Sequence, residues 1–508
     1  MIKFPTKHIA LNVWLCCFFY VLLAGFSIQL YILPNLFPQL HAGNGLLAGR
    51  DWVGFHEQAV AMAQQISLGG WDEFFLRPKE DNPIISVTSF FYYFFSPHPW
   101  TLLPLNAAVF AFGGVALYSI IKQLVLDDND ATISLLPYLF FPSALVQYAQ
   151  IHKDVFVTAG LLVFVWVCVQ LMGYERRLLR IVLVTFIGIA ALALVSVFRP
   201  YLMIVLYLMT MLLMLWSLVG FAYQFFKYIL SHKRVGYPSV LLSKFLPIAA
   251  LSIITLSASK LSTHHIVLNL QQLSFYGNTT QNTTQKSINH FPSRLPFIEL
   301  NSNINIRSAD SGRIFFEKDV AILNATEHCR PVVVLKEDAF FENALNRVFL
   351  KIAVAREGFT GTGGTTAASN IDNDINFCTK EDLIRYIPRA IQIAFFSPFP
   401  SEWLVMERRN SSSIEIYISA VEMFYCYIAF LGLFYWLIRY SKWSVALVVP
   451  ITLAIIPILL LGLTIANVGT LYRMRFPYLM IFVTFGMAGI LQFVKTIPIW
   501  VKHRDSND

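Results

Sequence analysis

The stretch "KHIALNVWLCCFFYVLLAGFSIQLYIL" (residues 7–33) is the first of ten apolar runs that decide the fold of this chain. The runs are about 18 to 25 residues long, which is the length a helix needs to cross about 30 Å of hydrocarbon. The composition agrees, because 56% of the 508 residues are hydrophobic and only 13% are charged, against roughly 25% charged residues in soluble domains. The first run lacks a small-residue cleavage site after it, so we expect a retained helix rather than a signal peptide. The sequence therefore predicts an all-α polytopic membrane protein.

The ten expected spans and the charges between them give a topology. Lys and Arg are about twice as frequent in the short loops on the side that contains the N-terminus, which places both termini in the cytoplasm. A further apolar stretch at 84–97 is short, and we expect it to be re-entrant or interfacial. The spans are predicted at about 9–33, 101–125, 132–149, 155–173, 181–198, 201–225, 245–262, 414–438, 444–466 and 476–494.

This topology divides the chain into three parts. Residues 1–262 form an N-terminal transmembrane module, whose first periplasmic loop (35–100) carries a juxtamembrane helix. Residues 263–413 form an extracytoplasmic domain, and 414–508 form the C-terminal transmembrane helices with a short cytoplasmic tail.

The extracytoplasmic domain is expected to be small and mixed α/β. "RPVVVL" (330–335) predicts a buried strand. "NALNRVFLKIAVAREGF" (343–359) predicts an amphipathic helix, with one apolar face made of Leu345, Val348, Phe349 and Ile352. Cys329 and Cys378 of this domain are either disulfide-bonded or free, and the sequence leaves both open.

The first loop contains a surface helix, "GRDWVGFHEQAVAMAQQISLGGW" (49–71), with its apolar face at Trp52, Phe55, Ala59, Met62 and Ile66. Asp51 stands at its start, where a carboxylate is common as a helix cap and is equally suited to chemistry. His56 on the same helix is either a substrate contact or an ordinary surface histidine.

Several ionisable residues lie at or inside the ends of the predicted spans. Lys153 and Asp154 precede the fourth span in "QIHKDVF" (150–156), and Arg199 lies in "SVFRPYL" (196–202) between two spans. Glu422 lies about 12 Å deep in the eighth span. Ions in such places normally need partners and mark function, although helix starts and membrane anchors are the ordinary alternatives.

Arg473 and Arg475 in "TLYRMRFPYLM" (470–480) precede the last span. Two residues apart on a helix, they diverge by about 200°. We therefore expect one to face a site and the other to be structural, with membrane anchoring as the alternative for both.

The order of these pieces resembles that of the GT-C glycosyltransferases, such as protein O-mannosyltransferases and lipid A aminoarabinose transferases. The matching pieces in the first 175 or so residues are Asp51, "FHEQA" (55–59), "GGW" (69–71), Pro83 and the Lys153–Asp154 pair. The Arg-x-Arg-x-Pro stretch resembles one found before the last span in many bacterial GT-C-like proteins. The stretch 356–403 resembles bacterial membrane proteins associated with surface polysaccharide. There Arg356, Asp372 and Asp374 either bind an acceptor or belong to a loop with local turn hydrogen bonds.

The resemblance implies a glycosyltransferase at the periplasmic face of a bacterial inner membrane. Its donor would be a polyprenyl-phosphate-linked sugar, and its acceptor a glycan or a lipid. Fixed cations would stabilise the departing phosphate, and Asp51 would be the catalytic base or would bind the acceptor. The expected substrate-binding residues are His56, Asp81, Lys153, Asp154, Arg199, Glu422, Arg473 and Arg475.

The sequence also bears on other partners and functions. Membrane lipids are expected partners, and nucleic acid is not, because the basic residues lie beside spans. No residue spacing predicts a metal site, although members of the GT-C superfamily include metal-dependent enzymes, so a divalent cation stays open as a cofactor. The alternatives are a polymerase of lipid-linked polysaccharide repeat units, a lipid-linked oligosaccharide flippase or transporter, and a scaffold without enzymatic activity.

Overall fold

A computed structural model gives the structure of the chain and divides it into two compact units. Unit 1 comprises Met1–Ser259, Ala394–Ile458 and Tyr472–Asp508, and unit 2 comprises Lys260–Ile393 and Leu459–Leu471. The segments 394–413 and 459–471 thus group differently from the expected domain division. The residues that the structure describes are 9–48, 51–74, 82–125, 127–173, 178–231, 248–257, 307–309, 312–316, 332–335, 340–360, 370–403, 413–439 and 444–504.

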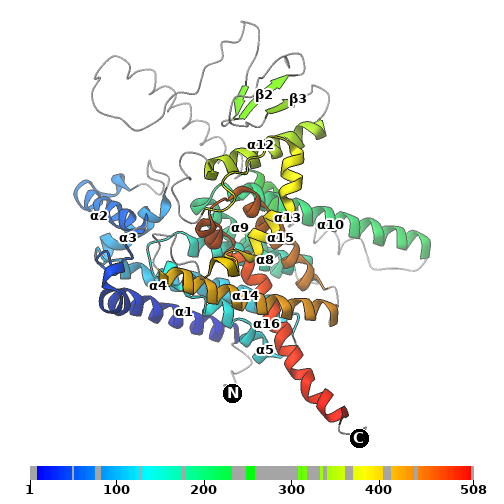
Figure 1. Ribbon diagram of the computed structural model, residues 1–508, viewed down its shortest axis with the longest axis horizontal. Helices are drawn as coiled ribbons and strands as arrows, with labels where there is room; N and C mark the ends of the chain where they lie inside the picture. The colour runs from blue at the N-terminus through cyan, green and yellow to red at the C-terminus, as the bar shows by residue number, and fades with distance from the viewer. Residues whose placement is uncertain are drawn as a thin grey trace. The chain divides into compact units, whose positions relative to one another are not determined.

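The described residues are mainly helical (Figure 1). The first helix, α1, continues as a π-helix over Ile28–Leu36, and the described loops contain four 3₁₀ turns. The helices are α1 (Ile9–Ser27), α2 (Asp51–Gly69), α3 (Pro83–Phe94), α4 (Leu103–Lys122), α5 (Asp128–Ser134), α6 (Leu136–Leu139), α7 (Pro142–Tyr148), α8 (Asp154–Met172), α9 (Leu178–Phe198), α10 (Leu202–Ser231), an unlabelled helix Ile248–Ser257, α12 (Phe340–Thr360), α13 (Lys380–Phe396), α14 (Ser413–Arg439), α15 (Val445–Thr464) and α16 (Val468–Arg504). The strands are β1 (Arg307–Ala309), β2 (Gly312–Phe316) and β3 (Val332–Leu335).

Among the described residues, eight helices are long and apolar enough to cross a membrane, so the chain is a multi-pass membrane protein. Of the span expected at 245–262, the structure describes a short apolar helix, Ile248–Ser257, and the rest lies outside the described residues. The eight are Ile9–Leu36, Pro99–Ile121, Asp154–Met172, Leu178–Phe198, Leu202–Gly220, Tyr417–Arg439, Val445–Thr464 and Val468–Ile497.

The prediction of one continuous helix at 132–149 is wrong. This stretch consists of three short helices, α5 to α7, because Pro137 and Pro142 lack the backbone N–H that would continue the ladder. The pieces nevertheless follow α4 from one end to the other. Their hydrogen bonds to α4 join Tyr118 to Asp128, Tyr138 to the Phe110 carbonyl and Asn106 to the Tyr148 carbonyl. The chain therefore runs alongside α4 in a broken path, and whether this stretch spans the membrane stays a prediction.

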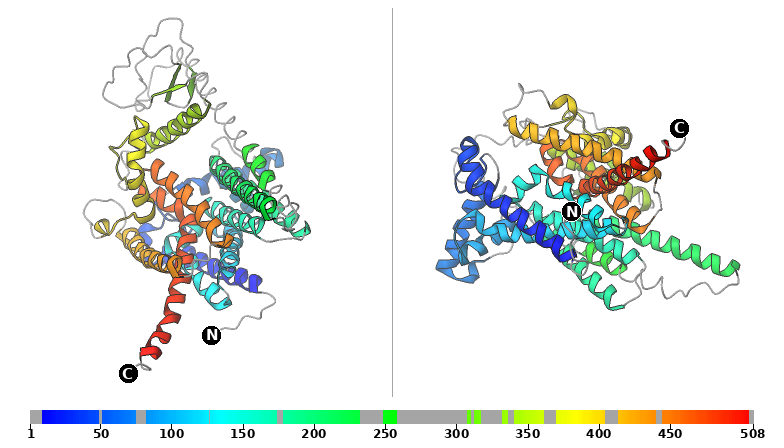
Figure 2. Two further views of the ribbon diagram at one scale, coloured as in Figure 1. Left: turned by 90° about the vertical axis from the view of Figure 1, so that its right-hand side faces the viewer. Right: turned by 90° about the horizontal axis from the view of Figure 1, so that it is seen from below.

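In unit 1, α8 is the most buried long helix, and it packs between α4 and α9 (Figure 1). Glycines allow close helix approach: a Cβ on Gly160 would meet Val195 of α9. The tightest crossing joins α14 to α16, where Gly486 and Gly489 lie against the backbone of Ala429 and Gly432. Figure 2 shows α16 as one continuous helix that ends near the C-terminus.

In unit 2, β2 pairs antiparallel with β1 and parallel with β3. The strand expected in "RPVVVL" is present as β3, whereas the small α/β domain as a whole stays a prediction, since much of 258–339 lies outside the described residues. Cys378 is disulfide-bonded; Cys329, the partner that the sequence suggests, also lies outside them.

The buried face of α12 differs from the expected one. Leu345 and Val348 are exposed, and the buried face is made of Asn346, Phe349, Leu350, Ala353 and Arg356. Hydrophobicity alone points the wrong way here, because the polar side chains of Asn346 and Arg356 lie inward and Arg356 donates to buried backbone carbonyls.

Candidate functional site

Three chain segments bring polar side chains together at one end of the helices of unit 1. His152 and Asp154 lie at the start of α8, Arg199 and Tyr201 lie in the link between α9 and α10, and Arg473 lies in the second turn of α16. Because α8 and α10 begin here and α9 ends here, the positive ends of two helix dipoles and the negative end of one lie at this site. We call His152, Asp154, Arg199, Tyr201 and Arg473 the anion cluster.

A buried ion pair forms the centre of the anion cluster. Arg199 donates through Nη2 to Asp154 Oδ1 and through Nη1 to the Tyr201 hydroxyl. Asp154 is 5% exposed and Arg199 is 9% exposed. Burial lowers the pKa of Arg199, but the adjacent Asp154 carboxylate and Tyr201 raise it by more, so the guanidinium stays charged. The pairing explains how a guanidinium is tolerated so close to hydrocarbon.

The anion cluster carries more positive than negative charge. Its single carboxylate faces two guanidiniums, Arg199 and Arg473. Among the described residues, Nε of Arg199 has no hydrogen-bond acceptor although it is buried. Buried donors are almost always satisfied, so one that lacks a protein acceptor points to water or a ligand. The arrangement is suited to an anion with several oxygens, because guanidinium groups bind such anions through paired hydrogen bonds.

His152 and Trp52 join the site although the sequence analysis did not select them for it. His152 Nδ1 lies 3.1 Å from Asp154 Oδ2, and His152 Nε2 lies 3.4 Å from Nη1 of Arg473. The ring of Trp52 meets the imidazole edge-on with centroids 6.0 Å apart. A usable signal for His152 was present, since it lies two residues before Asp154 in the same short turn.

Asp51 precedes Trp52, which contacts His152, but among the described residues Asp51 itself makes no contact with the site. It is the first residue of α2 and is exposed, and its neighbour Trp52 is buried against His152. Within the described part of the chain, no hydrogen bond or ion pair joins the Asp51 carboxylate to the anion cluster. The structure thus brings the start of α2 to the site, and the role of the carboxylate stays a prediction.

The two arginines of α16 diverge as the helical period predicts. Arg475 is fully buried and donates through Nη1 to the Ala394 carbonyl at 2.7 Å and through Nη2 to the Ser397 carbonyl. Its guanidinium also lies over the ring of Tyr472, 4.9 Å from the centroid. Arg475 therefore ties the end of α13 to α16 and is structural, whereas Arg473 belongs to the anion cluster.

Glu422 is buried in α14 but pairs with neither arginine of the anion cluster. Its Oε1 accepts the Ser143 backbone N–H at 2.6 Å, and its Oε2 accepts the Tyr472 hydroxyl at 2.5 Å. The carboxylate accepts from a backbone N–H in the first turn of α7, where the N–H groups of a helix have no partner within the helix. These contacts favour a structural role over the substrate-binding role that the sequence suggested.

The remaining predicted residues are not brought into the anion cluster. His56 accepts or donates to the Tyr92 hydroxyl at 2.7 Å and to Asn44 at 3.2 Å, and burial lowers its pKa. These contacts tie α2 to α3. Lys153 lies between His152 and Asp154 and is half-buried. Asp81 lies outside the described residues.

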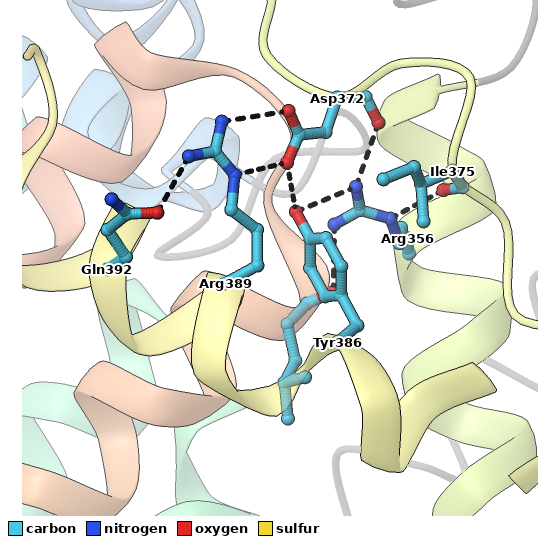
Figure 3. A network of polar contacts seen from close by, with 7 residues as sticks. Arg356, Asp372, Ile375, Tyr386, Arg389 and Gln392 are labelled. Atoms are coloured by element: carbon cyan, nitrogen blue, oxygen red, sulfur yellow. Dashed lines mark hydrogen bonds and ion pairs between the residues drawn. The ribbon is translucent and has the colours of Figure 1, made fainter. Parts of the chain in front are cut away.

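Unit 2 contains a separate polar network around Asp372 (Figure 3). Arg389 pairs with both carboxylate oxygens of Asp372, at 2.9 and 3.1 Å, and the Tyr386 hydroxyl donates to Oδ2 at 3.0 Å. Burial raises the pKa of Asp372, but the hydrogen bonds from Arg389 and Tyr386 outweigh it and leave the pKa below its usual value.

Arg356 is 1% exposed and shapes the loop that contains Asp372. It donates to the carbonyls of Asp372 and Ile375 at 2.9 and 2.7 Å, and to that of Leu463 at 3.2 Å (Figure 3). Asp372 adopts a left-handed backbone with φ of 51°. The alternative of a hydrogen-bonded loop thus describes Arg356 and Asp372 better than that of an acceptor site, and Asp374 takes no part in this network.

In the part of the chain that the structure describes, no three His, Cys, Asp or Glu side chains lie close enough together to hold a metal ion. No family model, curated protein or solved structure matches the chain.

Proposed function

We propose that this chain is a GT-C-like membrane glycosyltransferase that takes a sugar from a polyprenyl-phosphate carrier. The observation that carries the proposal is the anion cluster, in which two guanidiniums face one carboxylate at the end of membrane-spanning helices. A lipid-linked phosphate has its charge at the membrane surface, next to the ends of the spans, while its lipid tail lies in the hydrocarbon. A soluble anion would not need a binding site at the ends of membrane spans.

The cluster suits the charge that the reaction develops. The acceptor hydroxyl oxygen attacks the anomeric carbon of the sugar, the bond from that carbon to the carrier phosphate oxygen breaks, and the phosphate leaves with the bonding electrons. Arg199 and Arg473 would stabilise the added negative charge in a site with little water. Asp154 would hold the Arg199 guanidinium in place, and Tyr201 would fix its second nitrogen.

The proton of the acceptor hydroxyl needs a base, and we assign this role to Asp51. Its exposed carboxylate at the start of α2 is accessible to an acceptor, and the adjacent Trp52 connects α2 to His152. Ordinary carboxylate catalysis of this kind contributes about 10²- to 10⁴-fold in rate. The acceptor would be a glycan or a lipid at the same membrane face.

We place this face in the periplasm of a bacterial inner membrane. Arg473 and Lys495 are separated on α16 by about 33 Å of helix, close to the hydrocarbon thickness of about 30 Å. Lys495 pairs with Asp130 at 2.5 Å, and Lys122 pairs with Asp128 at 2.7 Å. These lysines lie at the end of the helices opposite to the anion cluster, and basic residues are enriched on the cytoplasmic side, so we assign that end to the cytoplasm.

The test is a transfer reaction with purified protein in nanodiscs, using radiolabelled polyprenyl-phosphate sugars and a panel of glycan and lipid acceptors. We expect label to move to an acceptor in the wild type, and Arg199→Gln to abolish the transfer. A matched pair, Asp154→Asn alone and combined with Arg199→Gln, separates folding from chemistry. The single variant leaves a buried charge uncompensated, which costs about 3–5 kcal/mol, and the double variant regains stability without activity.

The same reaction discriminates the other functions. A ladder of products would show a polymerase of lipid-linked repeat units. Movement of the carrier across the bilayer of proteoliposomes, without formation of any new bond, would show a flippase and would overturn the proposal. Absence of both transfer and lipid-phosphate binding would leave a scaffold.

A further inference from the structure

Gln150 is a buried amide that joins two segments distant in sequence. It lies two residues before His152 and is 1% exposed. Its Oε1 accepts the Leu47 N–H at 3.0 Å, and its Nε2 donates to the Gly45 carbonyl at 3.3 Å. Buried polar groups are hydrogen-bonded in folded proteins, and here the partners belong to the loop 41–48. One side chain therefore connects that loop to the segment that leads into α8.

The backbone of Leu47 extends this connection to α2. Its N–H donates to Gln150, and its carbonyl accepts from Nε1 of Trp52 at 2.6 Å. Trp52 directly follows Asp51 at the start of α2, and its ring contacts His152. The first turn of α2 is thus linked to the segment before α8 through two successive hydrogen bonds that share one residue.

The loop 41–48 has a constrained shape. Gly43, Asn44 and Gly45 all adopt a left-handed backbone, with φ of 101°, 53° and 76°. A Cβ added to Gly45 would lie 2.6 Å from the Gln29 carbonyl oxygen, so only glycine fits at this position. Backbone hydrogen bonds also join residues 40–42 to residues 46–48. We expect such a loop to keep its shape, so that a change in its contact with Gln150 displaces the start of α2.

The segment that contains Gln150 is itself held by the spans. Asn106 of α4 donates through Nδ2 to the carbonyls of Tyr148 at 2.9 Å and of Gln150 at 3.4 Å. Nε2 of Gln29, at the end of the first span, donates to the Ala149 carbonyl. Asn106 and Gln29 are each 1% exposed. The Gln150 side chain therefore extends from a fixed backbone.

We propose that Gln150 is a positioning residue that sets the distance of the Asp51 carboxylate from the Asp154–Arg199 pair. The inference rests on the proposed function, in which Asp51 takes the proton of the acceptor and Arg199 binds the carrier phosphate. The attacking and the leaving oxygen share one anomeric carbon in the transition state, so the base and the guanidinium must be held at a fixed separation. A misplacement of about 1 Å can cost about 100-fold in rate.

Two unrelated substitutions break this contact from its two sides. Gln150→Met keeps the length of the side chain and removes both hydrogen bonds, whereas Gly45→Ala displaces the loop and leaves Gln150 unchanged. We expect each to lower kcat for sugar transfer about 10- to 100-fold. The dissociation constant of farnesyl phosphate, measured by calorimetry in detergent, should change by less than about threefold, because the hydrogen bonds of Gln150 and Gly45 do not involve the Asp154–Arg199 pair.

Matched substitutions elsewhere in the same two helices serve as controls. Gln170→Met lies near the other end of α8, and Gly54→Ala lies on α2, where nothing lies within 4 Å of an added Cβ. Both should leave kcat within about twofold of the wild type.

The double variant of Gln150→Met and Gly45→Ala identifies the route of the effect. It should be no slower than the slower single variant, because both substitutions break one contact. Unchanged kcat in both single variants, or multiplied losses in the double variant, would overturn the proposal. So would a loss of farnesyl phosphate binding as large as the loss in kcat, because Gln150 would then act on the phosphate site.

Hydrogen exchange distinguishes a failure of this contact from a failure of the proposed function. If the wild type transfers no sugar to any acceptor, the proposed function is refuted, and the contact is measured through the exchange of backbone amides in 41–48 and 51–60. In Gln150→Met the Leu47 amide loses its acceptor, so exchange in both segments should be about tenfold faster, and Gln170→Met should leave it unchanged. Unchanged exchange in Gln150→Met would show that Gln150 does not hold the loop and would overturn the proposal.

Discussion

Arg473 and Arg475 lie two residues apart on α16, and the structure predicts opposite consequences for the same change at each. Arg475→Gln removes charged hydrogen bonds to two carbonyl oxygens at the end of α13. Hydrogen bonds to charged groups are worth about 1.5–3 kcal/mol each. Glutamine can remake part of one, so we expect a loss of about 3 kcal/mol in the free energy of unfolding.

Arg473→Gln should affect ligand binding rather than stability. The Arg473 side chain is half-buried, whereas that of Arg475 is fully buried, so we expect the loss of Arg473 to cost less stability than the loss of Arg475. If it donates one charged hydrogen bond to a phosphate, its removal weakens binding by about 10- to 100-fold.

Two assays on the same preparations measure these effects. Thermal unfolding in detergent should show a drop of several degrees for Arg475→Gln and a small change for Arg473→Gln. Calorimetric titration with farnesyl phosphate, at a temperature where both variants are folded, should show the reverse order. Equal effects of the two variants in both assays, or weakened binding by Arg475→Gln at unchanged unfolding temperature, would refute the assignment of one site arginine and one structural arginine.

Three further changes test other parts of the structure. Gly489→Leu should prevent the close crossing of α14 and α16 and lower the yield of folded protein, whereas Gly220→Leu, where nothing lies within 4 Å of an added Cβ, should not; size-exclusion profiles compare them. Asp372→Asn should cost about 2 kcal/mol in the free energy of unfolding at pH 7. Pairing with Arg389 lowers the pKa of Asp372, so the ionised carboxylate stabilises the folded state and the cost of the substitution should vanish as the pH falls below about 4. Equal unfolding temperatures of variant and wild type at pH 7 would contradict this. Asp51→Asn should abolish sugar transfer at unchanged unfolding temperature, and wild-type turnover by that variant would remove the carboxylate from the mechanism.

The sequence predicted the membrane spans well where one apolar run forms one helix. It failed at 132–149, because hydropathy averages over the run and ignores that Pro137 and Pro142 interrupt the backbone ladder. The hydrogen bonds that hold the broken path against α4, such as that from Tyr138 to the Phe110 carbonyl, join residues distant in sequence. No local pattern contains them.

The site was predictable in its charged members but not in their pairing. Helical periodicity separated Arg473 from Arg475, and burial near hydrocarbon singled out Arg199. The partner of Arg199 could not be deduced, because Asp154 lies 45 residues away and pairs with it only through the packing of α8 and α9. Arg356 shows a second reason: on an amphipathic helix an arginine is expected at the surface, and its burial could not be predicted because it depends on backbone carbonyls of other segments.

The most direct test of the account is an experimental map of the protein with a polyprenyl phosphate bound in nanodiscs. The account predicts phosphate density within hydrogen-bonding distance of Arg199 Nε and of the Arg473 guanidinium, with the lipid tail running along the spans. A phosphate bound elsewhere on the chain, with Arg199 and Arg473 both unliganded, would contradict it.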